Sequence, residues 1–558
     1  MSLKTASLAE VLSDDALLLL CMFLPAPALL RCGCSSLAFQ ERTRDSVVLW
    51  RSLCRSLLGM TLLKVHLCSA GGPGIETASF FRSLLRKAFL CPSLSYEPLL
   101  RKSCVQSLED TSAPSDEDGQ AASDANVRRQ LRHLLSASGH TACSLEHLVV
   151  VVGGWRKERP ADTDLALCVV NFGQEAGGAF PRLLEPRLAP GSARPTRRLR
   201  HSCCVVRPDF LPCLEGCPLA GQAVLVLGGC DDQSHRHCPG LNVLSLLQFT
   251  QPDGSEAVWH EVEASGDAPR SIWHHVAGPF ARGKRVVVFG GDFEASDPEF
   301  RYIQDRNAAA IVYVLDVDAR RWERVETSGR RPSWRSLHAG VTYESLADAS
   351  ERLVVFGGCE THCEIFSSGE AVGMRGHALD LQSFTWLMGP VVGEGGFVPV
   401  ARLRFAAERF GRFLLAYGGH GSDIEVEDDE CVIKLNLLTL SWDRVRIWNR
   451  PHGYRNIPAS TLSGGAIIGG VQPSPFGMRA VPKLDFLVLS DEMESAAEGS
   501  ADDMQVFSGE EDEDEDEDED PSRQVTVQVR GENGALRTVQ LNARLLSVLM
   551  RVGAMRRS

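Results

Sequence analysis

The sequence predicts a multidomain protein in which a small all-α module comes before an all-β array of repeated sheets. Two observations predict this fold class. Leucine-rich helical patterns fill residues 7–58, and apolar runs that end in Gly-Gly recur six times between residues 138 and 490. The chain has 558 residues, of which 44% are hydrophobic, so it is long enough for several domains that each bury a core.

Residues 7–58 are expected to form several short helices. Ser13 and the two acidic residues after it give an N-cap signal before a run of leucines. Pro25 ends this helix, because proline lacks a backbone N–H and clashes with the preceding turn. An apolar run at 47–54 closes the segment. By themselves these patterns indicate a small helical bundle that caps another domain.

The order of these features resembles the F-box, a motif that docks on a Skp-type adaptor of cullin ubiquitin ligases. The resemblance rests on the leucine-rich first helix, Phe-Leu-Pro at 23–25, Leu-Leu-Arg at 29–31, a cysteine-rich helix, and Leu-Trp-Arg-x-Leu-Cys at 49–54. Ser13 stands where the family usually has proline, and serine can cap that helix instead. The resemblance implies apolar anchors that enter a groove of the adaptor. The implied adaptor-binding residues are Leu12, Leu24, Pro25, Leu29, Leu30 and Trp50.

Two segments connect this module to the repeats. Residues 59–105 are predicted to be a helical extension, because apolar residues recur with helical spacing over 75–90. Residues 106–137 turn polar and acidic, which is the composition of a flexible linker.

The Gly-Gly runs are the main evidence for the β array. Each run has the length and β-branched content of a buried strand, and the glycine pair lets the chain turn where no Cβ fits. The second glycines of successive pairs are 51 to 75 residues apart. The pairs are Gly153 and Gly154, Gly228 and Gly229, Gly290 and Gly291, Gly357 and Gly358, Gly418 and Gly419, and Gly469 and Gly470.

Other residues recur at fixed offsets from the glycine pairs. A Pro-x-x-Arg-x-x-His segment or a variant of it precedes several runs, with Arg198 and Arg335 as examples. We interpret these arginines and histidines as packing residues and not as ligands, because their positions follow the repeat. A tryptophan follows four of the runs after a further strand pattern. These tryptophans are Trp259, Trp322, Trp386 and Trp442.

Together these features resemble kelch repeats, which implies a β-propeller of four-stranded blades over residues 138–490. Six glycine pairs predict six blades. The order of F-box and kelch array also resembles the corresponding half of the light-sensing F-box–kelch proteins of plants. Their flavin-binding module has no counterpart in the few residues ahead of the motif, so we expect no photochemistry.

Metal and catalytic chemistry have weaker support. Kelch propellers also occur in copper oxidases, which need several His and Tyr around one metal, and this chain has only six tyrosines. The cysteines and histidines within 213–238 and 359–363 lack the tight paired spacing of zinc sites. Common phosphate-binding, nucleophile and metalloprotease motifs are missing. We therefore expect no catalytic residue, no metal and no cofactor, with a galactose-oxidase-like metalloenzyme as the remote alternative.

The negative charge of the chain is concentrated in one segment. The formal net charge is −14, yet 18 acidic residues and no Lys or Arg lie between Asp485 and Asp520. Residues 491–522 are therefore predicted to be a disordered acidic segment, which acts as a spacer or docks a basic partner. The near-neutral remainder argues against binding of nucleic acid.

The cysteines and the apolar runs bear on the compartment. The 18 cysteines have irregular spacing and lie within apolar runs, which is typical of reduced thiols in an intracellular protein. The longest N-terminal apolar run, 16–24, is too short to cross a bilayer, and acidic residues flank it. We expect a cytoplasmic and/or nuclear protein that does not bind a membrane.

Residues 523–558 are predicted to form a strand, a turn, a second strand and a helix. This order resembles the opening of a small ubiquitin-like modifier, which here would be truncated. The alternative is a hairpin that closes the propeller, and the sequence leaves both open.

The resemblances imply a non-catalytic substrate-recognition subunit of a Skp–cullin–F-box type E3 ubiquitin ligase. The F-box would bind the adaptor, and through it a cullin, while propeller loops would bind an unknown target protein. The alternative is a kelch interaction scaffold outside a ubiquitin ligase. The loops expected to bind the target are 155–195, 207–222, 230–240, 292–308 and 359–376.

Overall fold

The computed structural model describes residues 46–97, 139–490 and 524–542, apart from gaps that fall mostly between strands. The chain divides into two compact units, Met1–Ala497 and Glu498–Ser558. The larger gaps are 155–164, 174–181, 231–240, 293–310, 360–373, 388–396, 420–430 and 449–460.

Two helices open the described part of the first unit. Helix α5 (Val47–Ser69) is kinked at Gly59, whose φ of 77° and ψ of 166° interrupt the helical backbone. Helix α6 (Ala78–Leu90) begins after Thr77, whose hydroxyl accepts a hydrogen bond of 3.1 Å from the backbone N–H of Phe80. Among the described residues, no helix is long and apolar enough to span a bilayer.

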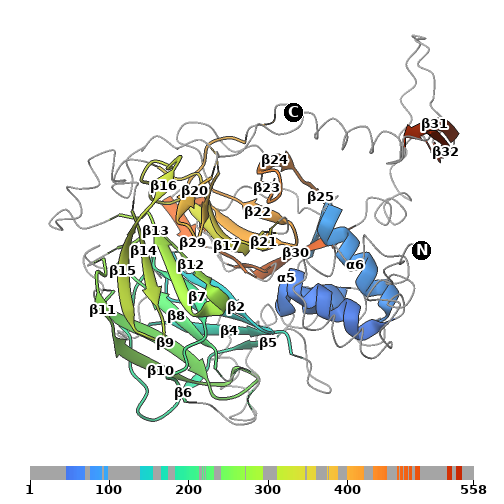
Figure 1. The fold of residues 1–558 in the computed structure, drawn as a ribbon. Coiled ribbons are helices and arrows are strands. Elements are labelled where there is room, and N and C mark those ends of the chain that lie inside the picture. The colour runs from blue at the N-terminus through green and yellow to red at the C-terminus, as the bar shows by residue number, and fades with distance from the viewer. Residues whose placement is uncertain are drawn as a thin grey trace, which may run out of the picture. The chain divides into compact units, whose positions relative to one another are not determined.

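Five sheets repeat one plan, in which antiparallel strands run from an inner to an outer edge in chain order (Figure 1). The first contains β2 (Thr141–Leu145), β3 (Leu148–Val152), β4 (Leu167–Asn171) and β5 (Arg182–Leu184). The second contains β7 (Ser202–Val206), β8 (Ala223–Leu227), β9 (Val243–Phe249) and β10 (Glu256–Glu263), with β6 (Arg187–Leu188) at its outer edge. The third contains β12 (Val276–Phe280), β13 (Arg285–Phe289), β14 (Ile311–Asp316) and β15 (Arg321–Glu326), with β11 (Ser265–Gly266) outermost.

The remaining two regular sheets follow the same plan. The fourth contains β17 (Ala339–Glu344), β18 (Glu351–Phe356), β19 (His377–Asp380) and β20 (Thr385–Trp386), with β16 (Ser328–Gly329) outermost. The fifth contains β21 (Ala406–Phe410), β22 (Phe413–Tyr417), β23 (Val432–Asn436) and β24 (Ser441–Arg444). A 3-10 turn, η2 (Ala281–Gly283), joins the first two strands of the third sheet.

A sixth sheet is composite, because one of its strands comes from the N-terminal side of the array. Its order is β25 (Arg446–Trp448), β1 (Ser93–Glu97), β30 (Leu484–Ser490), β27 (Ala466–Ile468) and β26 (Thr461–Ser463). Strand β1 runs antiparallel to β30 and parallel to β25. A separate hairpin of β28 (Val471–Ser474) and β29 (Gly477–Ala480) lies between β27 and β30 in the chain.

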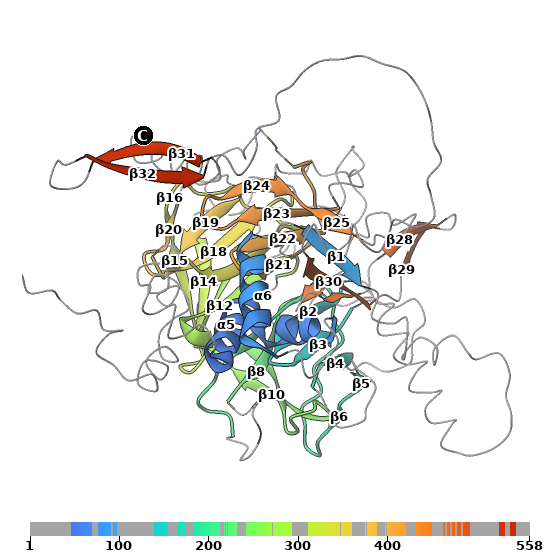
Figure 2. The ribbon, with the colours of Figure 1, turned by 90° about the vertical axis from the view of Figure 1, so that its right-hand side faces the viewer.

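The inner strands of these sheets form a closed ring. Strand β2 neighbours β7, and the contacts continue through β12, β17, β21 and β26 back to β2. Strand β1 takes the place in the sixth sheet that β10, β15 and β20 take in theirs, so the segment before the repeats closes the ring (Figure 2). The described residues therefore form a β-propeller of five regular blades and one composite sheet.

Two expectations from the sequence need correction here. The six-fold repeat predicted six similar blades, but the sixth sheet borrows its outer strand from residues 93–97. The extension over 59–105 was expected to be helical; the end of α5 and all of α6 lie within it, but residues 93–97 form the strand β1. The segment Ser-Leu-Ser-Tyr-Glu alternates polar and apolar residues for only five positions, and its strand partners lie some 350 to 400 residues later in the chain. Such a short pattern does not identify a strand without its partners.

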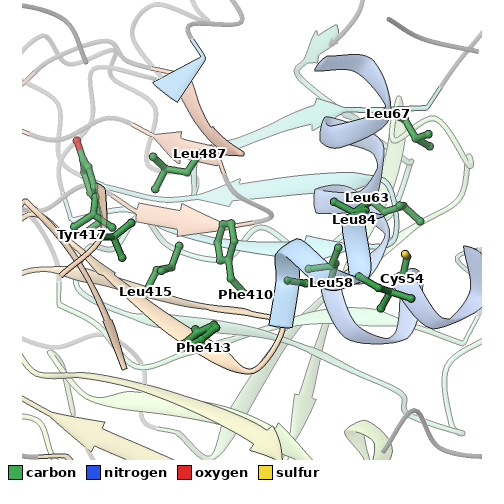
Figure 3. Packing of buried hydrophobic residues seen from close by; sticks show 14 of the residues in the cluster. Cys54, Leu58, Leu63, Leu67, Leu84, Phe410, Phe413, Leu415, Tyr417 and Leu487 are labelled. Carbon is green, nitrogen blue, oxygen red and sulfur yellow. The ribbon is translucent and has the colours of Figure 1, made fainter. Parts of the chain in front are cut away.

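The helices pack on the propeller through one continuous apolar cluster. Leu58 and Leu63 of α5 and Leu84 of α6 join Phe410 and Phe413 of the fifth sheet in this cluster (Figure 3). Gly411, in the turn between β21 and β22, approaches α6 so closely that an added Cβ would lie 2.6 Å from the carbonyl oxygen of Ala88. Arg55 of α5 also forms an ion pair of 2.6 Å with Glu146, in the turn between β2 and β3. The helices thus cover the end of the ring at which the first two strands of each sheet are joined, which we call the turn end.

In the second unit, the described residues form one antiparallel hairpin. It consists of β31 (Gln524–Arg530) and β32 (Leu536–Asn542). These strands match the two that the sequence predicts in the C-terminal piece. The predicted helix after them lies outside the described residues, as does the acidic segment.

Candidate functional site

The candidate site begins with an irregular backbone position just before each inner strand. Gly139, Arg200, His274, Leu337 and Arg404 occupy equivalent places in the five regular sheets, and all have positive φ, between 54° and 70°. A side chain in this left-handed region costs about 1 kcal/mol or more, so the surrounding contacts must hold the four non-glycine residues there.

Hydrogen bonds between neighbouring blades hold these residues. The backbone N–H of Arg200 donates to the carbonyl oxygen of Gly139 at 2.8 Å, and that of His274 donates to the carbonyl oxygen of Arg200 at 3.0 Å. The same pattern continues from Leu337 to His274 at 3.3 Å and from Arg404 to Leu337 at 3.1 Å. We call this chain of five residues the inner belt. It lies at the end of the ring opposite the turn end, because each second strand runs away from the turn toward its Gly-Gly pair.

The belt brings charged side chains together. Arg200 and Arg404 are half-buried, and His274 lies between them along the belt. The Nδ1 atom of His274 lies 2.9 Å from Oδ2 of Asp292, a buried residue directly after a Gly-Gly pair. Two guanidinium groups and one carboxylate therefore share this end of the ring.

The environment decides the charge of His274. Burial, together with the nearby guanidinium groups of Arg200 and Arg404, lowers its pKa to about 4. The carboxylate of Asp292 acts in the opposite direction but does not compensate for burial. His274 is therefore neutral at pH 7 and donates its Nδ1 hydrogen to Asp292. The arginines keep their charge, so the net charge of the belt with Asp292 is positive.

The belt adjoins the loops that the sequence predicts to bind a target. Cys230, Asp292 and Cys359 each follow a Gly-Gly pair and form an isolated β-bridge to a residue next to the belt. After each of them the chain enters one of the predicted loops, most of whose residues lie outside the described part. These three loops thus begin at the same end of the ring as the inner belt. The predicted loop 207–222 instead joins β7 to β8 at the turn end, and the range 155–195 includes strands β4, β5 and β6.

The arginines of the Pro-x-x-Arg-x-x-His segments are packing residues, as expected from their repeat. Arg198, Arg335 and Arg402 are buried, with at most 2% of their surface exposed. Nη1 of Arg335 donates to the carbonyl oxygen of Gly357 at 3.3 Å, and Nη1 of Arg402 donates to that of Gly418 at 3.4 Å. Arg335 and Arg402 thereby fix the Gly-Gly turns of their own blades.

The predicted tryptophans connect neighbouring blades. Nε1 of Trp322 donates to the carbonyl oxygen of Leu241 at 2.8 Å, across the boundary between the third and second sheets. The ring of Trp386 meets Phe289 edge-on, with centroids 5.2 Å apart. All four predicted tryptophans are buried, namely Trp259, Trp322, Trp386 and Trp442.

The described glycine pairs have positive φ at both positions. Gly290 shows why glycine is needed, because an added Cβ would lie 2.4 Å from Cε1 of His338 in the next blade. Gly469 and Gly470 lie outside the described residues.

The predicted adaptor-binding residues are mostly outside the described part of the chain. Leu12, Leu24, Pro25, Leu29 and Leu30 all precede residue 46. Trp50 lies in α5 and is partly buried against the apolar cluster between helices and propeller.

Sequence reasoning missed the inner belt. Its residues stand at one fixed place before each inner strand, which in three repeats is two positions after an arginine (Arg198, Arg335 and Arg402), and glycine, arginine, histidine and leucine all occur there. Varied and often charged residues at a fixed place among recurring packing residues are the signal that could have identified it. No cluster of three or more potential metal ligands occurs among the described residues.

Comparisons with known proteins match the propeller. Residues 215–468 match the family described as the KLHDC2/KLHL20/DRC7 Kelch-repeats domain. The chain is 29% identical over 163 residues to Acyl-CoA-binding domain-containing protein 4 of Arabidopsis thaliana, and 29% identical over 136 residues to the Rab9 effector protein with kelch motifs of Bos taurus. These alignments cover 29% and 24% of this chain, and 20% and 30% of the relatives. The chain thus spans less than a third of the length of these curated relatives.

Proposed function

The chain carries a kelch-repeat β-propeller domain, and from this premise we propose that it is a protein-interaction scaffold that binds an acidic segment of a partner protein at the inner belt. The observation that carries the proposal is the pairing of Arg200 and Arg404 around a neutral His274, with one buried carboxylate among them. Partly desolvated guanidinium groups bind carboxylates through strong, charge-assisted hydrogen bonds.

The position of the belt supports this function. Five blades hold its backbone by hydrogen bonds, so the arginines are presented on a rigid frame and lose little freedom on binding. The loops after Cys230, Asp292 and Cys359 start beside it and would supply side-chain selectivity. No bond is made or broken in this function, so we propose a binding protein and not an enzyme.

Binding of a labelled peptide to the full chain tests the proposal. A fluorescein-labelled peptide of alternating Glu and Gly should bind, while its Gln-for-Glu counterpart should not. Arg200→Ala and Arg404→Ala should each raise the Kd about tenfold, because each removes one charge-assisted hydrogen bond to the peptide. Arg187→Ala is the matched control, because Arg187 is an exposed arginine on edge strand β6, where it pairs with Glu256 at 2.7 Å. Equal binding of both peptides, or unchanged affinity in both belt variants, would contradict the proposal.

A second candidate is the finer function that the resemblance implies, a substrate receptor of a Skp–cullin–F-box ubiquitin ligase. One observation favours it: the helices that continue the F-box-like segment pack on the turn end, opposite the inner belt. Adaptor and target would then bind at opposite ends of the ring. Such a receptor works by proximity, because it holds target lysines near a conjugating enzyme. It would act in the cytoplasm and/or nucleus.

Capture of the full chain by an immobilised Skp-type adaptor tests this second candidate. The full chain is needed, since α5 continues past the F-box-like segment and packs on the propeller. Leu24→Asp should abolish capture. The matched control is Val48→Asp, because Val48 is 61% exposed in α5 and is not among the implied anchors. Absence of capture of the wild-type chain would remove the ligase reading and leave the scaffold function intact.

A further inference from the structure

Two cysteines face each other across the boundary between the first and second blades. Cys143 lies on β2 and Cys203 on β7, neighbouring inner strands of the ring. Their side chains form a thiol–thiol hydrogen bond. Of the nine cysteines whose side chains the structure describes, these two are partly exposed and the other seven are buried. The two partly exposed cysteines are therefore the two that touch each other.

The repeat does not explain this pair. At the corresponding boundary between the third and fourth blades, an added Cβ on Gly340 would meet Cγ1 of Val276, and one on Gly278 would meet Thr342. Small and apolar side chains thus suffice to pack neighbouring inner strands.

The hydrogen bond gives the two thiols different roles. It lowers the pKa of Cys203, whose thiolate accepts the bond, and it raises the pKa of Cys143, which donates it. Burial further raises the pKa of Cys143. The neighbouring Cys204 is buried, and burial raises its pKa as well, so it stays a thiol. Cys203 is therefore the more nucleophilic sulfur, and Cys143 is the thiol placed to react with it next.

We propose that Cys143 and Cys203 form a redox site, in which a hydroperoxide converts the two thiols to a disulfide that joins the first and second blades. The Cys203 thiolate attacks the outer oxygen of the hydroperoxide, the O–O bond breaks, and an alcohol (water, when the oxidant is hydrogen peroxide) leaves with a proton. Cys203 becomes a sulfenic acid. Cys143 then attacks the Cys203 sulfur, the S–O bond breaks, and water leaves with the proton of the Cys143 thiol. Overall the two thiols lose two electrons and the hydroperoxide gains them.

The disulfide would act on the part of the ring where closure occurs. Strand β2 neighbours both β7 and β26, the inner strand of the composite sheet. A covalent bond from β2 to β7 would close a loop of roughly 60 residues and hold the first blade in the ring. Oxidation should therefore raise the unfolding temperature by about 5 °C, and a thiol reductant should reverse the rise.

Peptide mapping of the full chain tests the proposal. After brief treatment with hydrogen peroxide and blocking of free thiols, mass spectrometry without reduction should find the peptides of Cys143 and Cys203 linked. The linked peptide and the rise in unfolding temperature should disappear together on reduction. Cys143→Ser should prevent the link and leave a Cys203 sulfenic acid that dimedone traps. Cys204→Ser is the matched control, and it should behave as wild type.

Two results would overturn the proposal. One is a folded wild-type chain in which both cysteines remain alkylatable thiols after peroxide treatment. The other is a link between Cys203 and some other cysteine in preference to Cys143. Should Cys143→Ser fail to fold, the map of the wild-type protein still decides between these results.

Discussion

Replacement of Phe81 by alanine should destabilise the propeller as well as the helices. Phe81 lies in α6 and is completely buried in the cluster that α5 and α6 share with the fifth and sixth sheets. Its carbonyl oxygen accepts a hydrogen bond of 3.2 Å from the Cys54 thiol, which ties the two helices together at this point. If the cluster joins helices and ring into one cooperative unit, a cavity in it weakens both.

The magnitude follows from the burial of the side chain. A phenylalanine buries about 200 Å² on folding, and truncation to alanine removes most of this apolar surface, worth about 4 kcal/mol at 25 cal/mol per Å². Incomplete collapse of the cavity keeps the cost within about 3–5 kcal/mol. Phe80 is the matched control, because it lies next to Phe81 in the same helix but only half-buried, with ring centroids 5.4 Å apart. Phe80→Ala changes helix propensity equally and should cost about 1–2 kcal/mol, since it removes less buried surface.

Urea unfolding followed by tryptophan fluorescence provides the assay. The tryptophans buried between blades report on the ring, and the titration is made in a Trp50→Phe background because Trp50 lies in α5. For Phe81→Ala, the midpoint of this transition should move to lower urea concentration while the slope stays constant. A fluorescence transition that stays at the wild-type midpoint, while helical circular dichroism melts early, would refute the reasoning. It would mean that the helices unfold independently of the ring.

Three further perturbations have expected outcomes that follow from the structure. Gly290→Ala should lower the free energy of unfolding by about 3 kcal/mol or more, because it adds a clash to the strain of positive φ. Gly191 also has a positive φ, of 79°, but open space around it, so Gly191→Ala should lower the free energy of unfolding by only about 1 kcal/mol in the same urea titration. Stability should fall as the pH drops below 6.5, because burial holds the pKa of His275 near 3 and that of His274 near 4, and the unfolded chain then binds protons that the folded chain does not. The expected loss in the free energy of unfolding is about 1.4 kcal/mol per pH unit for each histidine. Urea midpoints that do not change between pH 7 and pH 5 would contradict this prediction. Asp292→Asn removes the carboxylate beside the inner belt and should strengthen binding of the Glu-Gly peptide at low salt. The gain in affinity should disappear at 1 M NaCl, because salt screens the charges. Weaker binding at low salt would argue against the electrostatic role of the belt.

The sequence predicts those parts of the propeller that the repeat dictates. Gly290 recurs because the next blade's His338 leaves no room for a Cβ, and Trp322 recurs because each blade needs a large side chain between itself and its neighbour. Such packing requirements involve only one repeat and its neighbour, so the residues that meet them recur at regular spacing in the sequence. The packing role of Arg335 follows from the same periodicity.

Two features could not be predicted, and for different physical reasons. Strand β1 pairs with strands that lie some 350 to 400 residues later, so nothing near Ser93 in the chain indicates its partners. The inner belt is built by backbone geometry, because positive φ at Arg200 and Arg404 turns these residues to the inner edge of the ring. The residue type at this place varies between repeats and therefore carries no periodic signal.

Ring closure by β1 couples the position of the helices to the integrity of the propeller. Only two residues separate α6 from β1, so the strand that completes the sixth sheet is attached almost directly to the helix that packs on the turn end. Loss of β1 from the sheet would leave β30 with an unpaired edge and would also release the chain that anchors α6. The helices therefore hold a fixed orientation to the ring only while the ring is closed. A partner bound by the helices and a partner bound at the inner belt would then be held at a constant separation, which a flexible linker between two domains would not provide.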